Sequence, residues 1–202
     1  SLGNMLEKMA INIARLNYDV RQNVEGPLSP AQTSRIAELL EQYKSHKRKP
    51  SVDDYQSLRT IKPEKLFNKR HDSDYYLIDK ESNKHYLIEL KIGGDLDNKK
   101  ARSEKEAILE QYAILSNTLP QSVDISIFFA TAYNRFGEGK PWLQGRVRQF
   151  FADEELLIGK DFWDFVCKSD AGYQTVLAAY RENAHMIKSA LDDIKSVYLG
   201  DK

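Results

Sequence analysis

The sequence has little cysteine, little histidine and no long apolar run, and each shortage excludes a class of protein. The single cysteine, Cys167, excludes an internal disulfide framework and is typical of a reducing cytoplasm. Together with four scattered histidines it gives no zinc-ligand spacing. No apolar run approaches the roughly 20 residues of a membrane span, and the first residues show no secretory signal. We therefore expect a cytoplasmic protein without a membrane-spanning segment.

Net charge is also missing, because 30 basic residues balance 30 acidic ones. Their distribution is uneven: residues 44–71 carry nine Lys or Arg against three acids, and the chain from residue 153 onwards carries ten acids against six bases. Binding to phosphates depends on local patches of charge rather than on the total. The neutral total therefore does not exclude nucleic acid, and the basic stretch favours it on one side of the molecule. A solvated basic surface is the alternative for this stretch.

Length and composition predict a single domain over residues 1–202, because a chain of 202 residues with 41% hydrophobic content can bury a sizeable core. We divide it into an N-terminal helical part (1–70), an αβ core (71–133), a loop with a short helix (134–168) and a C-terminal helix (169–202).

Hydrophobic periodicity and cap residues predict helices at about residues 2–19, 29–45, 99–117 and 171–199. Residues 23–28 read as a loop, and residues 53–67 as helix and turn. Strand 84–91, helix 99–117 and strand 123–131 form a βαβ unit, whose strands are parallel. With a preceding hairpin, the pattern predicts an α/β fold of mixed α+β type, with a central mixed β-sheet flanked by helices.

Residues 71–94 (HDSDYYLIDKESNKHYLIELKIGG) read as that hairpin. A turn centred between Glu81 and Ser82 places Asp74 directly opposite Glu89. Side chains alternate faces along a strand, so Glu89 and Lys91 share a face with Asp74, and the residue between them points into apolar packing.

Two carboxylates and one ammonium this close together are costly on an apolar strand, and a divalent cation would relieve the repulsion. Mg²⁺ prefers oxygen ligands, which Asp74, Glu89 and the backbone carbonyl of Leu90 would supply, with Mn²⁺ as a substitute. Lys91 could then orient or deprotonate a water for attack on phosphorus. The alternative is a surface hairpin with an ordinary cross-strand ion pair. Asp72 competes with Asp74 for the metal, because both precede the strand with the same parity. We favour Asp74, because it lies opposite Glu89 in this register and Asp72 extends beyond that pair.

The spacing Asp-x14-Glu-x-Lys resembles the signature of the PD-(D/E)XK nuclease superfamily, although Ser73 stands where many members have proline. The resemblance implies a restriction-endonuclease-like core and a magnesium-dependent phosphodiesterase with Asp74, Glu89 and Lys91 as catalytic residues. Many members add an acid from an N-terminal helix, for which Glu38 and Glu41 are candidates beside the alternative of a solvated helix acid. A glutamine on the helix after the hairpin, here Gln111, often faces the site.

Two segments could contact DNA. Lys99 and Lys100 occupy the first turn of a predicted helix, where free amides already favour phosphate. The loop 134–148 intersperses glycines with the polar side chains Arg135, Lys140, Gln144, Arg146 and Arg148. Arg and Lys can pair with guanine and Gln with adenine in the major groove, so this loop could read bases. A structural loop with ordinary basic residues is the alternative.

A closer resemblance is carried by LIELKIGGDLDNKKARSEKEAILEQYA, FFATAYNRFGEGKPW and ELLIGKDFWDFVC, which look like Type II restriction endonucleases of the TdeIII kind over roughly residues 71–168. It implies cleavage of double-stranded DNA at a short, GGNCC-like site and a cognate DNA methyltransferase in the cell. Only Asp74, Glu89 and Lys91 carry over residue by residue.

The C-terminal helix has an apolar seam of nearly four heptads that resembles a coiled coil. The seam consists of Tyr173, Val176, Leu177, Tyr180, Ala184, Ile187, Leu191, Ile194 and Tyr198, and Gly200 closes the helix. It could pack on the chain's own core or form a homodimer, and a two-fold dimer suits the cutting of both strands of a palindrome.

Two alternatives to a sequence-specific endonuclease stay open. One keeps the same chemistry but recognises DNA structure, as junction resolvases and repair nucleases do. The other is a non-catalytic DNA-binding module, which would have no use for clustered carboxylates beside a phosphate.

Overall fold

The computed structural model describes residues 2–199 and contains a five-stranded sheet with the strand order β1-β2-β3-β4-β5. The strands are β1 (Asp19–Leu28), β2 (Phe67–Ile78), β3 (His85–Leu90), β4 (Ile125–Thr131) and β5 (Leu156–Ile158). The first three strands pair antiparallel and the last three parallel. The predicted mixed sheet is therefore confirmed.

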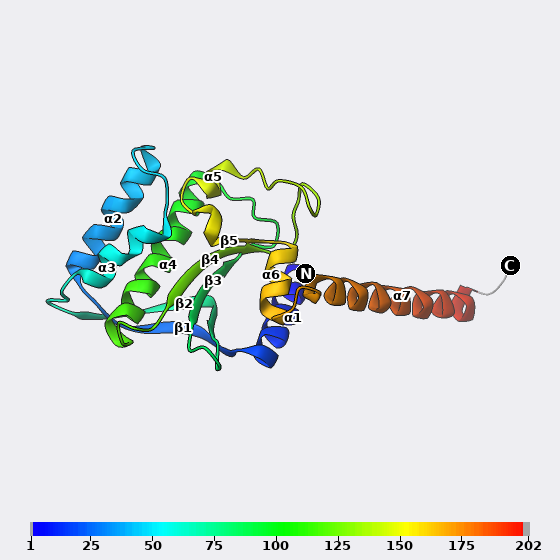
Figure 1. Cartoon of the computed structure of the whole chain (residues 1–202). Coiled ribbons are helices and arrows are strands. Elements are labelled where there is room, and N and C mark those ends of the chain that lie inside the picture. The colour runs from blue at the N-terminus through cyan, green and yellow to red at the C-terminus, as the bar shows by residue number, and fades with distance from the viewer. Residues whose placement is uncertain (1, 200–202) are drawn as a thin grey trace.

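Helices cover both faces of this sheet, as predicted (Figure 1). The α-helices are α1 (Leu2–Asn17), α2 (Pro30–Lys44), α3 (Gln56–Thr60), α4 (Asn98–Thr118), α5 (Gly145–Arg148), α6 (Lys160–Cys167) and α7 (Gly172–Leu199). Two 3₁₀ helices, η1 (Val52–Tyr55) and η2 (Asp153–Glu155), complete the described elements. Helices α2, α3 and α4 lie on one face of the sheet, and α1 and α6 lie on the other (Figure 1).

Each face of the sheet has its own hydrophobic core, because strand side chains alternate. Leu87 of β3 packs with the residues of α2 and α4, while Ile88 and Leu90 pack with those of α1 and α6. An odd-numbered residue of β3 therefore faces α4. This alternation sets the direction of Glu89 and Lys91.

Helix α4 is the central helix of its face and is fixed at both its start and its middle. The carboxylate of Asp97 caps it by accepting a hydrogen bond from the Lys100 amide. Further along, the wholly buried Lys105 pairs with Glu155 at 2.7 Å and donates to the hydroxyl of Tyr55. A buried ion pair with good partners fixes geometry more than it adds stability. The position of α4 over the sheet is thereby well defined.

The predicted loop at residues 23–28 is wrong, because these residues belong to strand β1. Gly26 is required by packing: a Cβ there would lie 2.8 Å from the Ile114 side chain of α4. Pro27 is tolerated because β1 is an edge strand, where a missing N–H does not interrupt the sheet. Strand β2 accordingly starts at Phe67 and is longer than the hairpin alone predicts.

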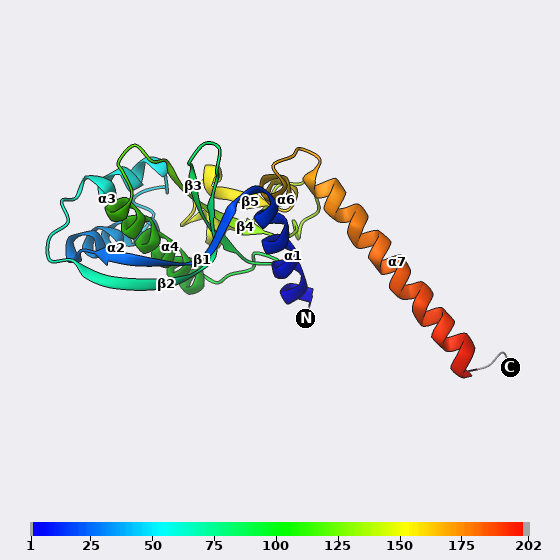
Figure 2. The ribbon, with the colours of Figure 1, turned by 90° about the horizontal axis from the view of Figure 1, so that it is seen from below.

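Helix α7 extends away from the sheet and its flanking helices (Figures 1 and 2). Its first turns pack on α6, whereas Tyr180, Met186 and Leu191 further along are exposed. The side chains of Ile187, Ile194 and Tyr198, and the predicted helix end at Gly200, lie outside the described part of the chain. No helix within residues 2–199 combines the length and the apolar character that crossing a membrane requires.

Candidate active site

The hairpin formed by β2 and β3 has the register predicted from its turn. Tyr75 pairs with Ile88 and Ile78 with His85, which centres the turn between Glu81 and Ser82. The amide of Asp79 closes this turn by donating to the Lys84 carbonyl at 2.9 Å. The next position along the register sets Asp74 against Glu89.

Asp74 lies where β2 leaves the ladder with β3. Its Oδ2 accepts a hydrogen bond from the Leu90 amide at 2.9 Å. The N–H and the C=O of one strand residue point to the same neighbouring strand. The Leu90 carbonyl is therefore directed toward the opening that Asp74 occupies.

An irregularity in β2 distinguishes Asp74 from Asp72. The register between β1 and β2 shifts between Arg21 and Asn23, which leaves extra β2 residues just before Tyr75. His71 reaches α4 and contacts Glu110 at 2.7 Å, so its neighbour Asp72 points to the other face and is exposed. Asp72 and Asp74 therefore do not share a face, and Asp74, favoured for its place opposite Glu89, is the one beside Leu90.

Lys91 lies between two carboxylates. Its Nζ is 2.6 Å from Glu89 Oε1 and 3.1 Å from Glu104 Oε1, and Glu104 belongs to the second turn of α4. The Lys91 amide continues the pairing with β4 by donating to the Ala130 carbonyl. The backbone and the ammonium of Lys91 are both held in place.

Glu104 was not predicted from the sequence. It lies seven residues before Gln111, and residues seven apart share one face of an α-helix. Helical spacing from Gln111 therefore predicts a site-facing position for Glu104, two turns earlier. Gln111 itself is buried, and its Oε1 has no hydrogen-bond partner within residues 2–199.

Burial and the charge of Asp74 raise the pKa of Glu89 to about 8, against the lowering effect of Lys91. Burial alone would lower the pKa of Lys91, but its hydrogen bond to Glu89 and the charges of Glu89 and Glu104 raise it above its ordinary value. The three acids Asp74, Glu89 and Glu104 thus outnumber the single ammonium. With a pKa of about 8 the Glu89 carboxyl is largely protonated at neutral pH, and a cation beside it would favour the ionised form.

A site where acids outnumber cations fits a divalent cation. No group of three or more His, Cys, Asp or Glu side chains in the described part of the chain has the arrangement of a metal site. The set formed by Asp74, Glu89 and the Leu90 carbonyl is smaller, with two carboxylates and one carbonyl. Mg²⁺ is bound in proteins by one or two carboxylates completed by waters and substrate phosphates. The hard oxygen donors present fit that requirement.

Glu38 does not join this cluster. It lies on the exposed side of α2, where it pairs with Arg35 at 2.8 Å, and Glu41 is exposed on the same helix. The buried side of α2 is apolar, with Ile36 and Leu39 in the core. Both glutamates have the solvated placement that was the alternative to a role at the site.

Three of the predicted DNA-contacting side chains come together. Arg135, Gln144 and Arg146 line a hollow of about 610 Å³ to which Asp95 and Asn98 also contribute. Residues 95 and 98 follow Lys91 closely in the chain, so this hollow adjoins the end of β3.

The other predicted DNA-contacting residues are outside this hollow. Lys99 and Lys100 are exposed in the first turn of α4, and Lys140 is exposed in its loop. Arg148 is held by the Trp142 carbonyl at 3.2 Å and by Asp153 at 2.7 Å.

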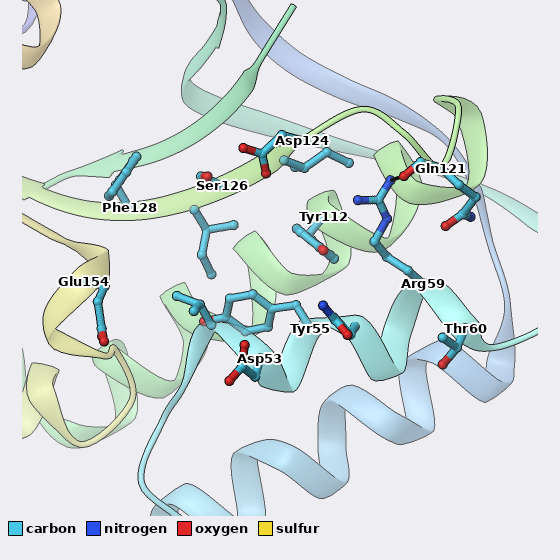
Figure 3. Close-up of a pocket in the computed structure, with 14 residues that line it drawn as sticks. Asp53, Tyr55, Arg59, Thr60, Tyr112, Gln121, Asp124, Ser126, Phe128 and Glu154 are labelled. Atoms are coloured by element: carbon cyan, nitrogen blue, oxygen red, sulfur yellow. Dashed lines mark hydrogen bonds between the residues drawn. The ribbon is translucent and has the colours of Figure 1, made fainter.

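A second hollow, of about 580 Å³, lies along the N-terminal half of β4 (Figure 3). Neither Glu89 nor Lys91 lines it. Asp53, Asp124 and Glu154 line it together with Arg59 (Figure 3). Arg59 is engaged by the carbonyls of residues 120, 121 and 123. Three acids around one arginine that already donates to backbone carbonyls do not form a phosphate-binding site.

Comparison with known proteins identifies the family. A family model described as "Type II restriction endonuclease, HinfI" matches residues 1–184, which include the whole sheet, the Asp74–Glu89–Lys91 cluster and the first turns of α7. No curated protein and no solved structure matches the sequence. The match over most of the chain confirms the predicted restriction endonuclease at the level of the family. The chain belongs to the HinfI family of Type II restriction endonucleases and is an endodeoxyribonuclease.

Proposed function

We propose that this endonuclease requires Mg²⁺ and hydrolyses phosphodiester bonds of double-stranded DNA at a short specific site, with Asp74, Glu89 and Lys91 as its catalytic residues. The observation that carries the proposal is the largely buried carboxylate of Glu89, which lies beside Asp74 and 2.6 Å from the Lys91 ammonium. A surface ion pair would explain one acid and one base. It does not explain why acids outnumber the ammonium at a site where the Glu89 side chain is only 12% exposed.

Each residue has a role that its contacts support. Asp74 and Glu89 would hold Mg²⁺ with the Leu90 carbonyl, and the Leu90 amide orients Asp74. When bound, the metal supplies Lewis-acid polarisation of the phosphate and a more acidic water. Lys91 has a raised pKa and stays protonated at neutral pH, which favours a role in orienting the nucleophile and stabilising charge on the phosphate over one as a general base.

Glu104 is a positioning residue in this proposal. Its carboxylate, on α4, lies 3.1 Å from the Lys91 ammonium, in addition to the contact with Glu89. The ammonium would then keep its place when Glu89 turns to a metal ion. Gln111, on the same face of α4, is an auxiliary candidate because its Oε1 has no partner within residues 2–199.

DNA would lie across the end of β3 and the loop 134–148. The exposed ammonium groups of Lys99, Lys100 and Lys140 are suited to phosphates, which position the duplex without reading sequence. Arg135, Gln144 and Arg146 share one hollow and are suited to base edges. Arg148 makes internal contacts instead.

We further propose that the whole chain acts as one nuclease domain of the PD-(D/E)XK superfamily and works as a homodimer beside a cognate DNA methyltransferase. The acid at the start of the hairpin, followed by Glu-x-Lys at the end of the partner strand, supports the superfamily assignment. The TdeIII-like resemblance, its GGNCC-like site and the use of Mn²⁺ in place of Mg²⁺ stay predictions.

Plasmid digestion tests this proposal. Plasmid DNA is incubated with the enzyme and Mg²⁺, with EDTA, and with the Asp74→Ala variant, and Asp72→Ala serves as the matched control. We expect discrete Mg²⁺-dependent fragments from the wild type and from Asp72→Ala, and intact plasmid from Asp74→Ala. Normal cutting by Asp74→Ala would contradict the assignment of the metal ligands. A smear or a nick with the same Mg²⁺ dependence would favour a structure-selective nuclease.

A further inference from the structure

The segment that follows Lys91 packs tightly against the loop that carries Arg135. Gly94 has a φ of +68°, and a Cβ there would lie 2.6 Å from the Thr131 side chain and 2.8 Å from the ring of Trp142. Trp142 is itself buried. Residues 92–97 and the loop 134–148 are therefore held together. The side chains that line the hollow of Arg135, Gln144 and Arg146 therefore have a defined position relative to Lys91.

Asp95 and Arg135 form an ion pair at the edge of this hollow. Arg135 Nη1 is 2.8 Å from Asp95 Oδ2, and both side chains are largely exposed, at 41% and 67%. Arg135 lowers the pKa of Asp95, and Arg146 and Gln144 lower it further, so the carboxylate is ionised and faces several donors. An ionised acceptor and a guanidinium thus stand side by side where the duplex would lie.

The pair matches the major-groove edge of a G·C base pair. Guanine presents the acceptors O6 and N7, which a guanidinium binds in a bidentate fashion, and cytosine presents the N4 amino group, which a carboxylate accepts. Without DNA, Asp95 and Arg135 form an ion pair with one another. On binding, each group can exchange its partner for one base of the same pair. An exposed ion pair is worth little in stability, so the exchange costs little.

A second exposed Arg–Asp pair in the same region has different surroundings. Arg148 lies 2.7 Å from Asp153, and its guanidinium also donates to the Trp142 carbonyl at 3.2 Å. That second contact ties Arg148 to the backbone of the loop. Neither member of the pair lines the hollow beside residues 95 and 98. The Arg148–Asp153 pair is therefore a matched control for the Asp95–Arg135 pair.

We propose that Asp95 is a specificity-determining residue, which together with Arg135 reads one G·C pair of the recognition site. The inference rests on the proposed function, because it needs duplex DNA beside Lys91. It assigns a role to an acidic side chain in a DNA interface, where acids are otherwise unfavourable. Arg146 and Gln144, on the same hollow, are then placed to read the adjoining base pairs.

The test compares cleavage of matched duplexes. The site is first read from the sequenced ends of wild-type fragments, and each base pair of the site is then replaced in turn. We expect kcat/KM of the wild type to fall about 10- to 100-fold when the G·C pair is changed. Asp95→Ala and Arg135→Ala should lose most of this discrimination at that one pair and keep it elsewhere. Asp153→Ala should discriminate as the wild type does at every position.

The inference would be overturned by full discrimination by Asp95→Ala, or by a loss spread evenly over all positions and shared by Asp153→Ala. A site without any G·C pair would overturn it as well. The nuclease proposal fails separately if the wild type does not cut DNA. Duplexes selected for binding from a random-sequence pool in EDTA would then supply the site, and loss of selectivity at one G·C pair by Asp95→Ala would decide the role of Asp95, because recognition does not require cleavage.

Discussion

Glu89 makes the fold less stable at neutral pH than at acid pH, because its largely buried carboxyl group lies beside the charge of Asp74. Its pKa in the folded chain is raised above the ordinary value, so folding favours the protonated form. The stability that this form provides is fully present below the ordinary glutamate pKa and is lost as the pH rises toward about 8. A destabilising acid of this kind is expected where function requires the charge.

Replacing Glu89 by glutamine should therefore stabilise the protein while it removes cleavage. We expect Glu89→Gln to raise the free energy of unfolding at pH 8 by about 1–2 kcal/mol, less than the whole pKa shift would give because an ion pair with Lys91 is also lost. The gain should shrink at pH 5. Urea unfolding at both pH values measures it, with the exposed turn residue in Glu81→Gln as control. A lower free energy of unfolding for Glu89→Gln than for the wild type at pH 8 would show that the Glu89 carboxylate does not destabilise the fold.

Glu104 acts on the reaction through Lys91. Glu104→Gln removes one of the two carboxylates that hold the ammonium, so Lys91 should be misplaced and its pKa should fall. We expect kcat to fall about 10- to 100-fold with little change in KM, because a small misplacement of a catalytic group costs rate rather than binding.

The matched control is Glu106→Gln on the same helix, whose carboxylate pairs with Arg102 at the surface. It should keep the wild-type kcat. Equal effects of the two variants, or an effect of Glu104→Gln on KM alone, would show that Glu104 contributes only to structure or to DNA binding.

At the scale of elements, the hairpin could be predicted because strand alternation and a turn centre together fix a register. The register that pairs Tyr75 with Ile88 was confirmed. Strand β1 could not be predicted in this way, since Gly26 and Pro27 signal a loop unless the packing of α4 and the edge position of the strand are known.

Contacts between elements that are distant in the chain could not be predicted from the sequence either. Glu104 comes close to Lys91 only through the position of α4 over the sheet, which depends on contacts far along the chain, such as the one between Lys105 and Glu155. The difference between Asp72 and Asp74 arises from an irregular register with β1, a strand that was not expected. Local patterns therefore predicted the hairpin but not the residues brought to it.

The contact between residues 92–97 and the loop 134–148 should be sensitive to a single methyl group at Gly94. Gly94→Ala should cost about 2–4 kcal/mol, since it combines a left-handed backbone with a clash against Thr131 and Trp142. Gly139 is the matched control: its φ is +77° and nothing lies within 4 Å of an added Cβ. Gly139→Ala should cost only about 1–2 kcal/mol. Thermal unfolding distinguishes them, and equal costs would contradict the packing.

At the scale of the whole molecule, α7 projects from the body and exposes Tyr180, Met186 and Leu191 (Figures 1 and 2). An extended helix with apolar side chains gains stability by pairing with a second copy. We predict a homodimer at micromolar concentration and a monomer for Leu191→Asp, as measured by analytical ultracentrifugation. The exposed polar position in Ser189→Asp is the control and should stay dimeric. A monomeric wild type would contradict the dimer.

The central claim is that the cluster around Lys91 cuts DNA, and the most direct test is the single-turnover cleavage rate of Lys91→Ala in saturating Mg²⁺. Lys84→Ala, in the turn of the same hairpin, is the control. We predict a rate about 100- to 10,000-fold lower for Lys91→Ala, with an unchanged fold by circular dichroism, and a wild-type rate for Lys84→Ala. A folded Lys91→Ala variant that cuts within about threefold of the wild-type rate would contradict the account.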